Sequence, residues 1–377
     1  MLISELETPA LILDRSRLDR NIARMREKLS RHGVALRPHV KTAKSIEVVR
    51  RALAGQPGGI TVSTLKEAEQ FFVHGITDIL YAVGVAPGKL DHVAALRSKG
   101  ADVTVLLDSV EAAHAVANRG RALGVEFPAL IEIDSDGHRS GIRPGAAALI
   151  EIGRILENAS GARLRGVMTH AGGSYNCASI DALHAIAEQE RAAVVDCAAA
   201  LRDAGLPCPV VSVGSTPTAT FGQSFTGVTE VRAGVYMLFD LVMAGLGVCA
   251  VEDIAVSVLA TVIGHQPDKG WIITDAGWMA LSRDRGTARQ TLDQGYGLVC
   301  DAEGRPADDL IVRDTSQEHG IIADRQGRVL HAPRYPVGTQ LRILPNHACA
   351  TAAQHAAYHV VNGNAAIEAV WPRFGGW

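Results

Sequence analysis

The sequence contains little that points to nucleic acid or to a membrane. Aromatic residues make up 5% of the 377 positions, and 37 Lys and Arg against 40 Asp and Glu give a net charge of −3. Few rings and scattered basic residues argue against the basic, aromatic surfaces that bind nucleic acid. No segment reaches the ~18 uninterrupted apolar residues of a membrane-spanning helix, and residues 1–7 lack the basic start of a signal peptide. We therefore expect a cytoplasmic protein.

Cysteine is also scarce. The six cysteines include no CxxC pair and no dense framework, which favours a reducing compartment. We expect five of them to be small core residues: Cys177, Cys197, Cys208, Cys249 and Cys300. Cys349 differs, because a histidine lies two positions before it.

Apolar, β-rich runs alternate with helical segments over the first two thirds of the chain. Residues 15–31 place Leu18, Ile22, Met25 and Leu29 at helical spacing, and residues 178–204 form a long Ala-rich amphipathic segment. The predicted strands are 35–40, 59–64, 78–83, 103–108, 128–134, 165–170, 209–213 and 229–235. Eight such units, without a GxGxxG turn after the first strand, favour an α/β fold of the closed (β/α)₈ TIM barrel type over an open doubly wound sheet.

The pattern changes after about residue 245. Short strands with Gly, Pro and Asp turns follow, for example over 254–264, 270–275 and 340–344, and predict a separate β domain. We expect the barrel at 15–245 and the β domain at 246–377. The β domain would include residues 1–14, since 9–14 is a strand left over from the barrel count.

Lys41 is the candidate catalytic residue of the barrel. It closes the strand-like run 35–41, and alternation would place Arg37, His39 and Lys41 on one face. A primary amine at the C-terminal end of a barrel strand is a candidate Schiff-base lysine, because barrel active sites lie at that end. Lys44, beyond the turn, is the weaker candidate, and a solvated basic loop is the plain alternative.

Other polar residues also follow predicted strands: Ser63, Thr64, Asp108, Asp134, His170, Gly214, Ser215, Thr216, Gly234 and Tyr236. The segment 213–218 combines small residues, backbone N–H groups and hydroxyls after strand seven, where barrels often bind phosphate. A simple Ser/Thr turn is the alternative. An amine and a phosphate cup at the mouth of one barrel together suggest pyridoxal 5′-phosphate.

His347 and Cys349 form a candidate metal site in the β domain. In an extended segment, residues two apart share a face, so both side chains can bind one ion, with water or substrate completing its coordination. Thiolate and imidazole favour zinc or a similar transition ion over magnesium. A core histidine beside a buried cysteine is the alternative. His355 and His359, four apart on a predicted surface helix over 352–358, are a rival pair.

Four segments resemble, in the same order, the fold-type III pyridoxal-phosphate enzymes of the D-serine dehydratase and D-threonine aldolase family. They are Arg37-Pro38-His39-Val40-Lys41-Thr42, Asp136-Gly137-His138-Arg139-Ser140-Gly141, Gly214-Ser215-Thr216 and Pro345-Asn346-His347-Ala348-Cys349. The resemblance covers essentially the whole chain. Within the family, residues 61–69 and 275–280 look most similar to the D-threo-3-hydroxyaspartate dehydratases.

The resemblance implies an alanine-racemase-like barrel, an antiparallel β domain, a homodimer, and a divalent metal beside the cofactor: zinc, or manganese, magnesium or cobalt. It implies that Arg139 lies near the cofactor's phenolic oxygen and the substrate carboxylate, with His170 and Tyr175 around its ring. A surface charge, a core histidine and a core tyrosine are the respective alternatives. Tyr236 would add its hydroxyl to the cup of Gly214, Ser215, Thr216 and Gly234, or would be structural.

The reaction that fits is β-elimination of water from a D-3-hydroxy amino acid. Lys41 would remove the α-proton, and the metal on His347 and Cys349 would assist loss of the β-hydroxyl. The products would be oxaloacetate and ammonia from D-threo-3-hydroxyaspartate, or pyruvate from D-serine. Arg283, Arg285 and Arg289 are candidates for binding a second carboxylate.

Three alternatives stay open at this stage. They are aldolase cleavage to glycine and an aldehyde, racemisation, and cofactor binding without catalysis. The His-x-Cys pair argues against the aldolase because the family's aldolases tend to carry His-x-Asp, and the large β domain argues against a non-enzymatic protein. The segment 317–320 has no assigned role.

Overall fold

The computed structural model describes residues 1–328 and 334–377, which form two compact units. One unit comprises Arg24–Gly234 with Gly376–Trp377, and the other comprises Met1–Ala23 with Val235–Gly375. The division falls within helix α1 (Arg15–Arg31), whereas the sequence places the start of the barrel at residue 15. Within the described residues, no helix is long and apolar enough to span a membrane.

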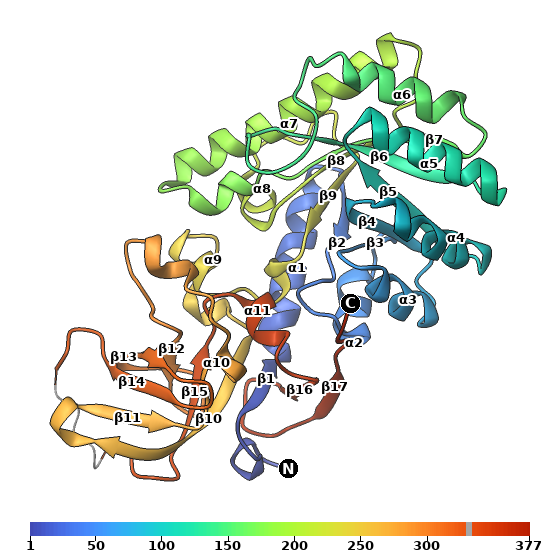
Figure 1. Cartoon of the computed structure of the whole chain (residues 1–377). Coiled ribbons are helices and arrows are strands. Elements are labelled where there is room, and N and C mark those ends of the chain that lie inside the picture. The colour runs from blue at the N-terminus through green and yellow to red at the C-terminus, as the bar shows by residue number, and fades with distance from the viewer. Residues whose placement is uncertain (329–333) are drawn as a thin grey trace. The chain divides into compact units, whose positions relative to one another are not determined.

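The first unit contains a sheet of eight parallel strands that curls into a nearly closed barrel (Figure 1). Its strands are β2 (Ala35–Pro38), β3 (Ile60–Val62), β4 (Asp78–Gly84), β5 (Asp102–Leu107), β6 (Phe127–Ile133), β7 (Ala162–Thr169), β8 (Val210–Val213) and β9 (Glu230–Ala233). Each pairs with its neighbour, and β9 pairs with β2. Between β2 and β3, a single bridge joins His39 to Thr61, and the Val40 amide donates to the Thr61 carbonyl at 2.9 Å. The predicted TIM-like barrel is confirmed.

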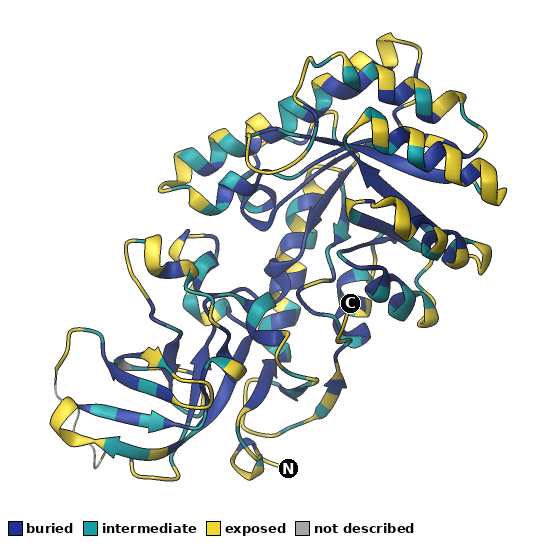
Figure 2. Ribbon diagram, viewed as in Figure 1, coloured by how far each residue is buried: buried dark blue, intermediate teal, exposed yellow. Residues whose placement is uncertain are grey.

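Helices connect the strands. The outer faces of the helices are exposed, whereas the strands are mostly buried (Figure 2). They are α2 (Ile46–Leu53), α3 (Leu65–Val73), α4 (Leu90–Ser98), α5 (Val110–Leu123), α6 (Ala148–Asn158), α7 (Ile180–Asp203) and α8 (Thr216–Phe221). Thr64, Ser109 and Ser179 cap helices because each hydroxyl accepts an otherwise unpaired amide of the first turn. In α1, all four residues predicted for the apolar face are buried, as the spacing requires.

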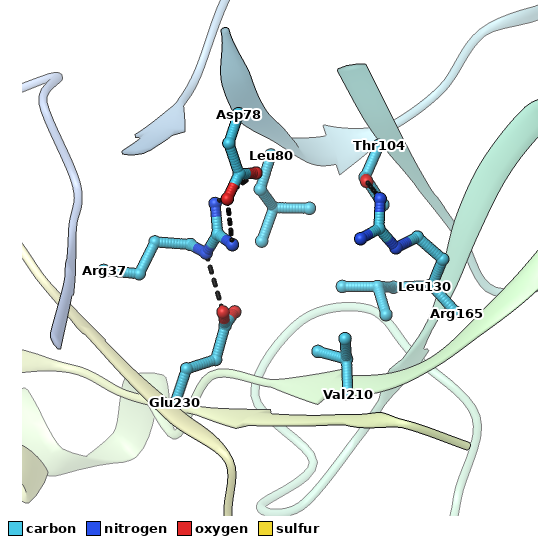
Figure 3. A pocket seen from close by; sticks show the side chains of 8 residues that line it. All are labelled: Arg37, Asp78, Leu80, Thr104, Leu130, Arg165, Val210 and Glu230. Atoms are coloured by element: carbon cyan, nitrogen blue, oxygen red, sulfur yellow. Dashed lines mark hydrogen bonds and ion pairs between the residues drawn. The ribbon is translucent and has the colours of Figure 1, made fainter. Parts of the chain in front are cut away.

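Arg37 corrects one expectation. Strand β2 ends at Pro38, so the alternation predicted through Lys41 stops there. The Arg37 guanidinium donates to Asp78 at 2.9 Å and to Glu230 at 2.7 Å, and these carboxylates belong to the first residues of β4 and β9 (Figure 3). Burial lowers the pKa of Arg37, but the two carboxylates outweigh this and raise it. Arg37 therefore fills the N-terminal end of the barrel and does not face the mouth with Lys41.

The other unit is built on a nine-stranded sheet, in the order β11-β14-β13-β12-β15-β10-β1-β16-β17. An additional pairing of β10 with β11 closes six of its strands into a barrel, and the pairings are antiparallel except that of β1 with β16. The strands are β1 (Ala10–Asp14), β10 (Val256–Gln266), β11 (Trp271–Thr274), β12 (Leu298–Cys300), β13 (Pro306–Thr315), β14 (Gly320–Asp324), β15 (Gln340–Leu344), β16 (Ala357–Val361) and β17 (Ala369–Pro372). The predicted antiparallel β domain and its N-terminal strand are confirmed.

Short helices interrupt this sheet: α9 (Leu241–Gly245), α10 (Trp278–Leu281) and α11 (Ala348–Ala352). The helix expected over 352–358 is wrong, since α11 ends at Ala352 and His359 lies in strand β16. His355 lies between them and bonds through Nε2 to the Ala280 carbonyl at 3.0 Å. His355 and His359 therefore share no helical face.

Candidate active site

Lys41 lies in the turn that follows β2, at the C-terminal end of the barrel strands. The Lys44 amide donates to the Val40 carbonyl at 2.8 Å and closes this turn around Lys41. Lys41 itself is exposed. The ammonium of Lys44, by contrast, lies 3.3 Å from a carboxylate oxygen of Glu67. Of the two lysines, Lys41 is the better placed to react with a carbonyl group.

Two imidazoles lie close to this amine. His170 follows β7, and its Nδ1 is 2.8 Å from the Gly214 carbonyl oxygen, which can only accept, so Nδ1 carries the proton. Burial, helped by the nearby charges of Arg232, Lys41 and Arg139, lowers the pKa of His170 to about 3. His170 is therefore neutral near pH 7, with Nε2 available as an acceptor.

The pKa of His39 also lies well below its usual value. Burial is the main cause, followed by the charges of Lys41 and Arg232 and by His170. These electrostatic contacts place Lys41, His39 and His170 in one cluster with Arg232. Arg139, on the loop after β6, is exposed, lies 3.5 Å from Glu132, and acts on His170.

The predicted phosphate cup is partly occupied by the protein's own hydrogen bonds. The Gly214 amide donates to Glu190 Oε1 at 3.1 Å, and the Ser215 amide donates to Thr218 Oγ1 at 3.0 Å. These two N–H groups therefore already have partners within the chain. The Ser215 hydroxyl caps α8 and lies 3.0 Å from Ser174 Oγ, which leaves a group of buried hydroxyls at the end of β8.

Two glycines of the cup are required by the backbone. Gly214 has φ +144°, and a Cβ there would lie 1.9 Å from the Arg232 carbonyl oxygen. A Cβ at Gly234 would lie 2.7 Å from the His39 carbonyl oxygen. These contacts bring the ends of β8 and β9 against the segment that leads to Lys41.

The residues present fit an anionic cofactor that carries an aldehyde. His39 Nδ1 is a buried atom with no hydrogen-bond partner in the described parts of the chain, next to the turn that presents Lys41. The cations Lys41 and Arg232 lie near His39, Arg139 lies near His170, and hydroxyls line the adjoining cup. A buried polar atom without a partner costs free energy, so a polar ligand there is favourable.

Sequence reasoning missed Glu190 and Arg232. Glu190 lies on the apolar face of α7, where burial raises its pKa, and it accepts from the amides of Ala171 and Gly214. Arg232 is buried in β9 and donates from Nε to Ser212 at 2.8 Å. A charged residue at an apolar position of a predicted helix or strand is the signal that identifies both.

The remaining predicted residues are placed as follows. The ring of Tyr175, in the short helix η3 (Gly172–Asn176), is centred 6.3 Å from that of His170. The loop after β6 is held by Asp108, which accepts from the Gly141 amide at 3.0 Å. Tyr236 is fully buried in η4 (Val235–Met237), which belongs to the unit with the nine-stranded sheet.

His347 and Cys349 are adjacent, but not in the predicted way. Strand β15 ends at Leu344, His347 precedes the first residue of α11, and Cys349 is its second residue, so the extended geometry is wrong. The turn at the start of the helix nevertheless brings the thiol within hydrogen-bonding distance of the imidazole. Asp240 fixes this turn because its carboxylate accepts from the Ala348 amide at 2.9 Å.

Asp284 lies behind His347, with its Oδ2 2.8 Å from His347 Nδ1. Burial lowers the pKa of His347, but Asp284 and Cys349 outweigh this and raise it to about 11. A metal ion on the other ring nitrogen, Nε2, would displace the proton that the imidazolium carries there. Asp284 would then orient the ring, as carboxylates do behind metal-binding histidines. The described residues contain no group of three or more His, Cys, Asp or Glu side chains arranged for a metal. The donor set therefore fits a soft transition ion with two protein ligands and open positions.

Two family models match the chain and divide it much as the structure does. Residues 13–241 match "Alanine racemase, N-terminal domain", and residues 255–361 match "Putative serine dehydratase domain". The first match alone covers more than half of the chain. This chain belongs to the fold-type III pyridoxal-phosphate enzymes of the alanine racemase and serine dehydratase family.

Relatives within the family are similar over almost the whole length. The chain is 56% identical to the D-threo-3-hydroxyaspartate dehydratase of Delftia sp. strain HT23, over 99% of this chain and 98% of that protein. It is 30% identical to the D-serine dehydratase of Dictyostelium discoideum, over 96% of this chain and 95% of that protein. The solved structure of the Delftia enzyme covers 100% of both chains with a TM-score of 0.98.

Variants of that Delftia enzyme bear on the candidate metal site. Two solved forms have alanine in place of a histidine or of a cysteine two positions later, and the cysteine variant is in a metal-free form. A histidine followed two residues later by cysteine occurs in this chain only at His347 and Cys349.

We expect His170 to make the folded protein sensitive to acid. Between about pH 6.5 and about pH 3, the unfolded chain binds a proton at His170 that the folded chain does not, so stability falls as the pH falls through this range. In His170→Gln this contribution disappears, and the slope of unfolding free energy against pH should decrease by up to about 1.4 kcal/mol per pH unit. Urea unfolding of the apoprotein between pH 4 and 7 measures this slope. His114→Gln, at an exposed position, is the control, and equal slopes for both variants would contradict the assignment.

Proposed function

We propose that this chain is a pyridoxal-phosphate- and divalent-metal-dependent dehydratase. It eliminates water from D-threo-3-hydroxyaspartate and yields oxaloacetate and ammonia, and D-serine, which would give pyruvate, is the second candidate substrate. The observation that carries the proposal is the contact between His347 and Cys349, with Asp284 2.8 Å behind the imidazole. A metal ion at such a site would assist an elimination, because hydroxide is a poor leaving group and a Lewis acid helps it depart.

Lys41 is the residue proposed to bind the cofactor and to move the α-proton. When bound, pyridoxal phosphate supplies an aldehyde for the amine and a pyridinium ring that accepts the charge released at the α-carbon. The Lys41 amine, exposed in its turn, accepts the α-proton at Nζ. His170 competes poorly for this proton, because a pKa of about 3 makes its neutral imidazole a weak base, and its Nδ1–H donates to the Gly214 carbonyl.

Binding and orientation fall to the neighbouring residues. We propose that Arg139 binds the substrate carboxylate and that the hydroxyls of Ser215 and Thr216, with Gly214, Gly234 and Tyr236, surround the phosphate. The role of Tyr175 is to border the ring beside His170. A metal on His347 and Cys349 would supply Lewis-acid assistance to departure of the hydroxyl, while Asp284 and Asp240 hold the two ligands in place.

The proposed function is tested by identifying products. The purified protein is incubated with pyridoxal phosphate, a divalent metal and one of three substrates: D-threo-3-hydroxyaspartate, D-serine or D-threonine. A 2-oxo acid and ammonia support the dehydratase and rank its substrates. Glycine and an aldehyde would instead make the chain an aldolase and overturn the proposal.

Replacing Lys41 by Ala should remove the visible absorbance of the bound cofactor and reduce turnover at least 10³-fold, roughly the loss of a general base together with covalent attachment. Absorbance spectra of the reconstituted protein and initial rates measure the two effects. Lys66→Ala, on the outer part of helix α3, is the control. Full absorbance in Lys41→Ala would move the attachment to another lysine.

Replacing Cys349 by Ala should remove the bound metal and stop elimination, while the cofactor stays attached. The reason is that the thiolate belongs to the metal site and not to the cluster around Lys41. Metal content per chain, cofactor absorbance and initial rates are measured together. Cys177→Ala is the control because Cys177, also half-buried and free, follows η3 and has no histidine two positions before it. Unchanged activity after complete chelation would contradict the Lewis-acid role.

Arg283 is the best placed of the three arginines to bind the second carboxylate of hydroxyaspartate. That carboxylate is attached to the same carbon as the hydroxyl, so its binding residue must be near the metal ligands. Arg283 directly precedes Asp284, lies over the Trp278 ring at 5.3 Å, and has no carboxylate partner among the described residues. Arg285, in contrast, is paired with Asp293 at 2.7 Å. The Trp278 ring orients the Arg283 guanidinium by a cation–π contact.

We expect Arg283→Gln to reduce kcat/KM for D-threo-3-hydroxyaspartate by about 10- to 100-fold, the value of one charge-assisted hydrogen bond of about 1.5–3 kcal/mol. The kcat/KM for D-serine, which has no second carboxylate, should change less than twofold. Steady-state kinetics with both substrates give the ratio, and Arg285→Gln is the control. An equal loss for both substrates would exclude Arg283 as the selective residue.

We further propose a cytoplasmic homodimer. The scattered free cysteines, Cys177, Cys197, Cys208, Cys249, Cys300 and Cys349, support a reducing compartment. The dimer rests on the resemblance to the family.

A further inference from the structure

The turn that carries Lys41 has an unfavourable backbone conformation at its end. Lys44 has φ +44°, and the only other non-glycine residues with positive φ in the described ranges are Phe239 and Ser282. A side chain with a Cβ is disfavoured in this left-handed region, so neighbouring contacts must maintain it. The turn is anchored at its start, where the His39 amide donates to the Ala233 carbonyl at 2.7 Å and Val40 is bonded to Thr61.

Glu67 supplies a contact at the other end of the turn. It lies in the first turn of α3 and is 2% exposed. Its Oε1 is 3.3 Å from the Lys44 ammonium, and that oxygen has no hydrogen-bond partner among the described residues, so this ion pair is its main compensation. Its Oε2 accepts from the Ser63 amide at 2.8 Å. Glu67 thus joins Lys44 to the end of β3.

The segment 61–69 is also one of the two that look most similar to the hydroxyaspartate dehydratases, and no residue of it has so far been given a part in the reaction. Within this segment, the Thr61 carbonyl accepts from the Val40 amide at the start of the lysine turn, and Glu67 forms an ion pair with Lys44 at its end. Lys41 lies between these two attachment points. The long, flexible side chain of a lysine lets its amine reach many positions unless the backbone is fixed. Precise placement of a reacting group contributes much of the rate acceleration in catalysis.

We propose that Glu67 and Lys44 form a positioning pair that holds the 40–44 turn in the conformation from which the Lys41 amine reaches the cofactor aldehyde. Lys44 is thus a positioning residue and not a second nucleophile. The inference rests on the proposed attachment of pyridoxal phosphate to Lys41, but not on which substrate is used.

The test compares two lysine–glutamate pairs whose glutamates both lie in helix α3. Glu67→Gln and Lys44→Gln each remove one charge of the proposed pair. Lys66→Gln and Glu69→Gln remove the charges of the half-buried pair Lys66–Glu69, which has the same 3.3 Å separation. For each apoprotein, we would measure the second-order rate of cofactor attachment from its absorbance, the Tm, and then kcat and KM after saturation with the cofactor.

Glu67→Gln and Lys44→Gln should slow attachment at least tenfold at temperatures well below their Tm, and should lower kcat more than they change KM. The control variants should attach the cofactor at the wild-type rate. Lys44→Arg, which keeps the cation, should restore most of the rate. The double variant Lys44→Gln with Glu67→Gln should be no slower than the slower single variant, because both act through one interaction.

Wild-type attachment rates in both single variants, with only the Tm lowered, would reduce the pair to a structural role and overturn the inference. Complete loss of the bound-cofactor absorbance in Lys44→Gln, with full absorbance in Lys41→Ala, would overturn it differently by making Lys44 the attachment site. If the dehydratase proposal fails, this test still gives an answer, because the rate of cofactor attachment is measured without any substrate.

Discussion

The geometry of the barrel mouth depends on how the chain closes the gap between β2 and β3. These strands share no regular ladder, and the described contact is one bridge between His39 and Thr61 with the amide of Val40 bonded to the same residue. Because β2 has already ended at Pro38, the turn that follows completes the ring of strands. Lys41, the residue proposed to bind the cofactor, therefore lies in the segment that completes the ring of strands, next to the β2–β3 bridge and to β9.

The mouth also has an unbalanced electrostatic character. Burial, together with the charges of Arg232 and Lys41, lowers the pKa of His39 and of His170, so both rings stay neutral near pH 7. Two carboxylates lie nearby. Burial raises the pKa of Glu190, whose Oε1 accepts from two amides, and Glu132 lies 3.5 Å from Arg139. The cations Arg232 and Lys41 suit a site where a phosphate and a substrate carboxylate are proposed to bind.

Much of this arrangement was predictable from local pattern. Strand periodicity located the eight barrel strands to within a few residues, and the rule that parallel strands end together placed Lys41, His170 and Gly214 at one end. The features that local pattern did not predict depend on contacts between residues that are far apart in the sequence. Arg37 turns inward because Asp78 and Glu230 are there, and His347 is oriented by Asp284, 63 residues before it. The extended geometry expected at His347 failed because a helix begins there, and a five-residue helix has too short a periodic signal to be recognised.

Strand β1 has a consequence for the order in which the chain folds. Residues 10–14 pair with β10 and with β16, whose strands begin at Val256 and Ala357. The barrel strands, in contrast, follow one another without interruption between Ala35 and Ala233. On a ribosome, the barrel strands can therefore assemble before the partners of β1 have been made, and a fully buried strand stays unpaired until β10 and β16 follow. Residues 10–14 are synthesised before the barrel strands, yet they pair only with strands synthesised after the barrel.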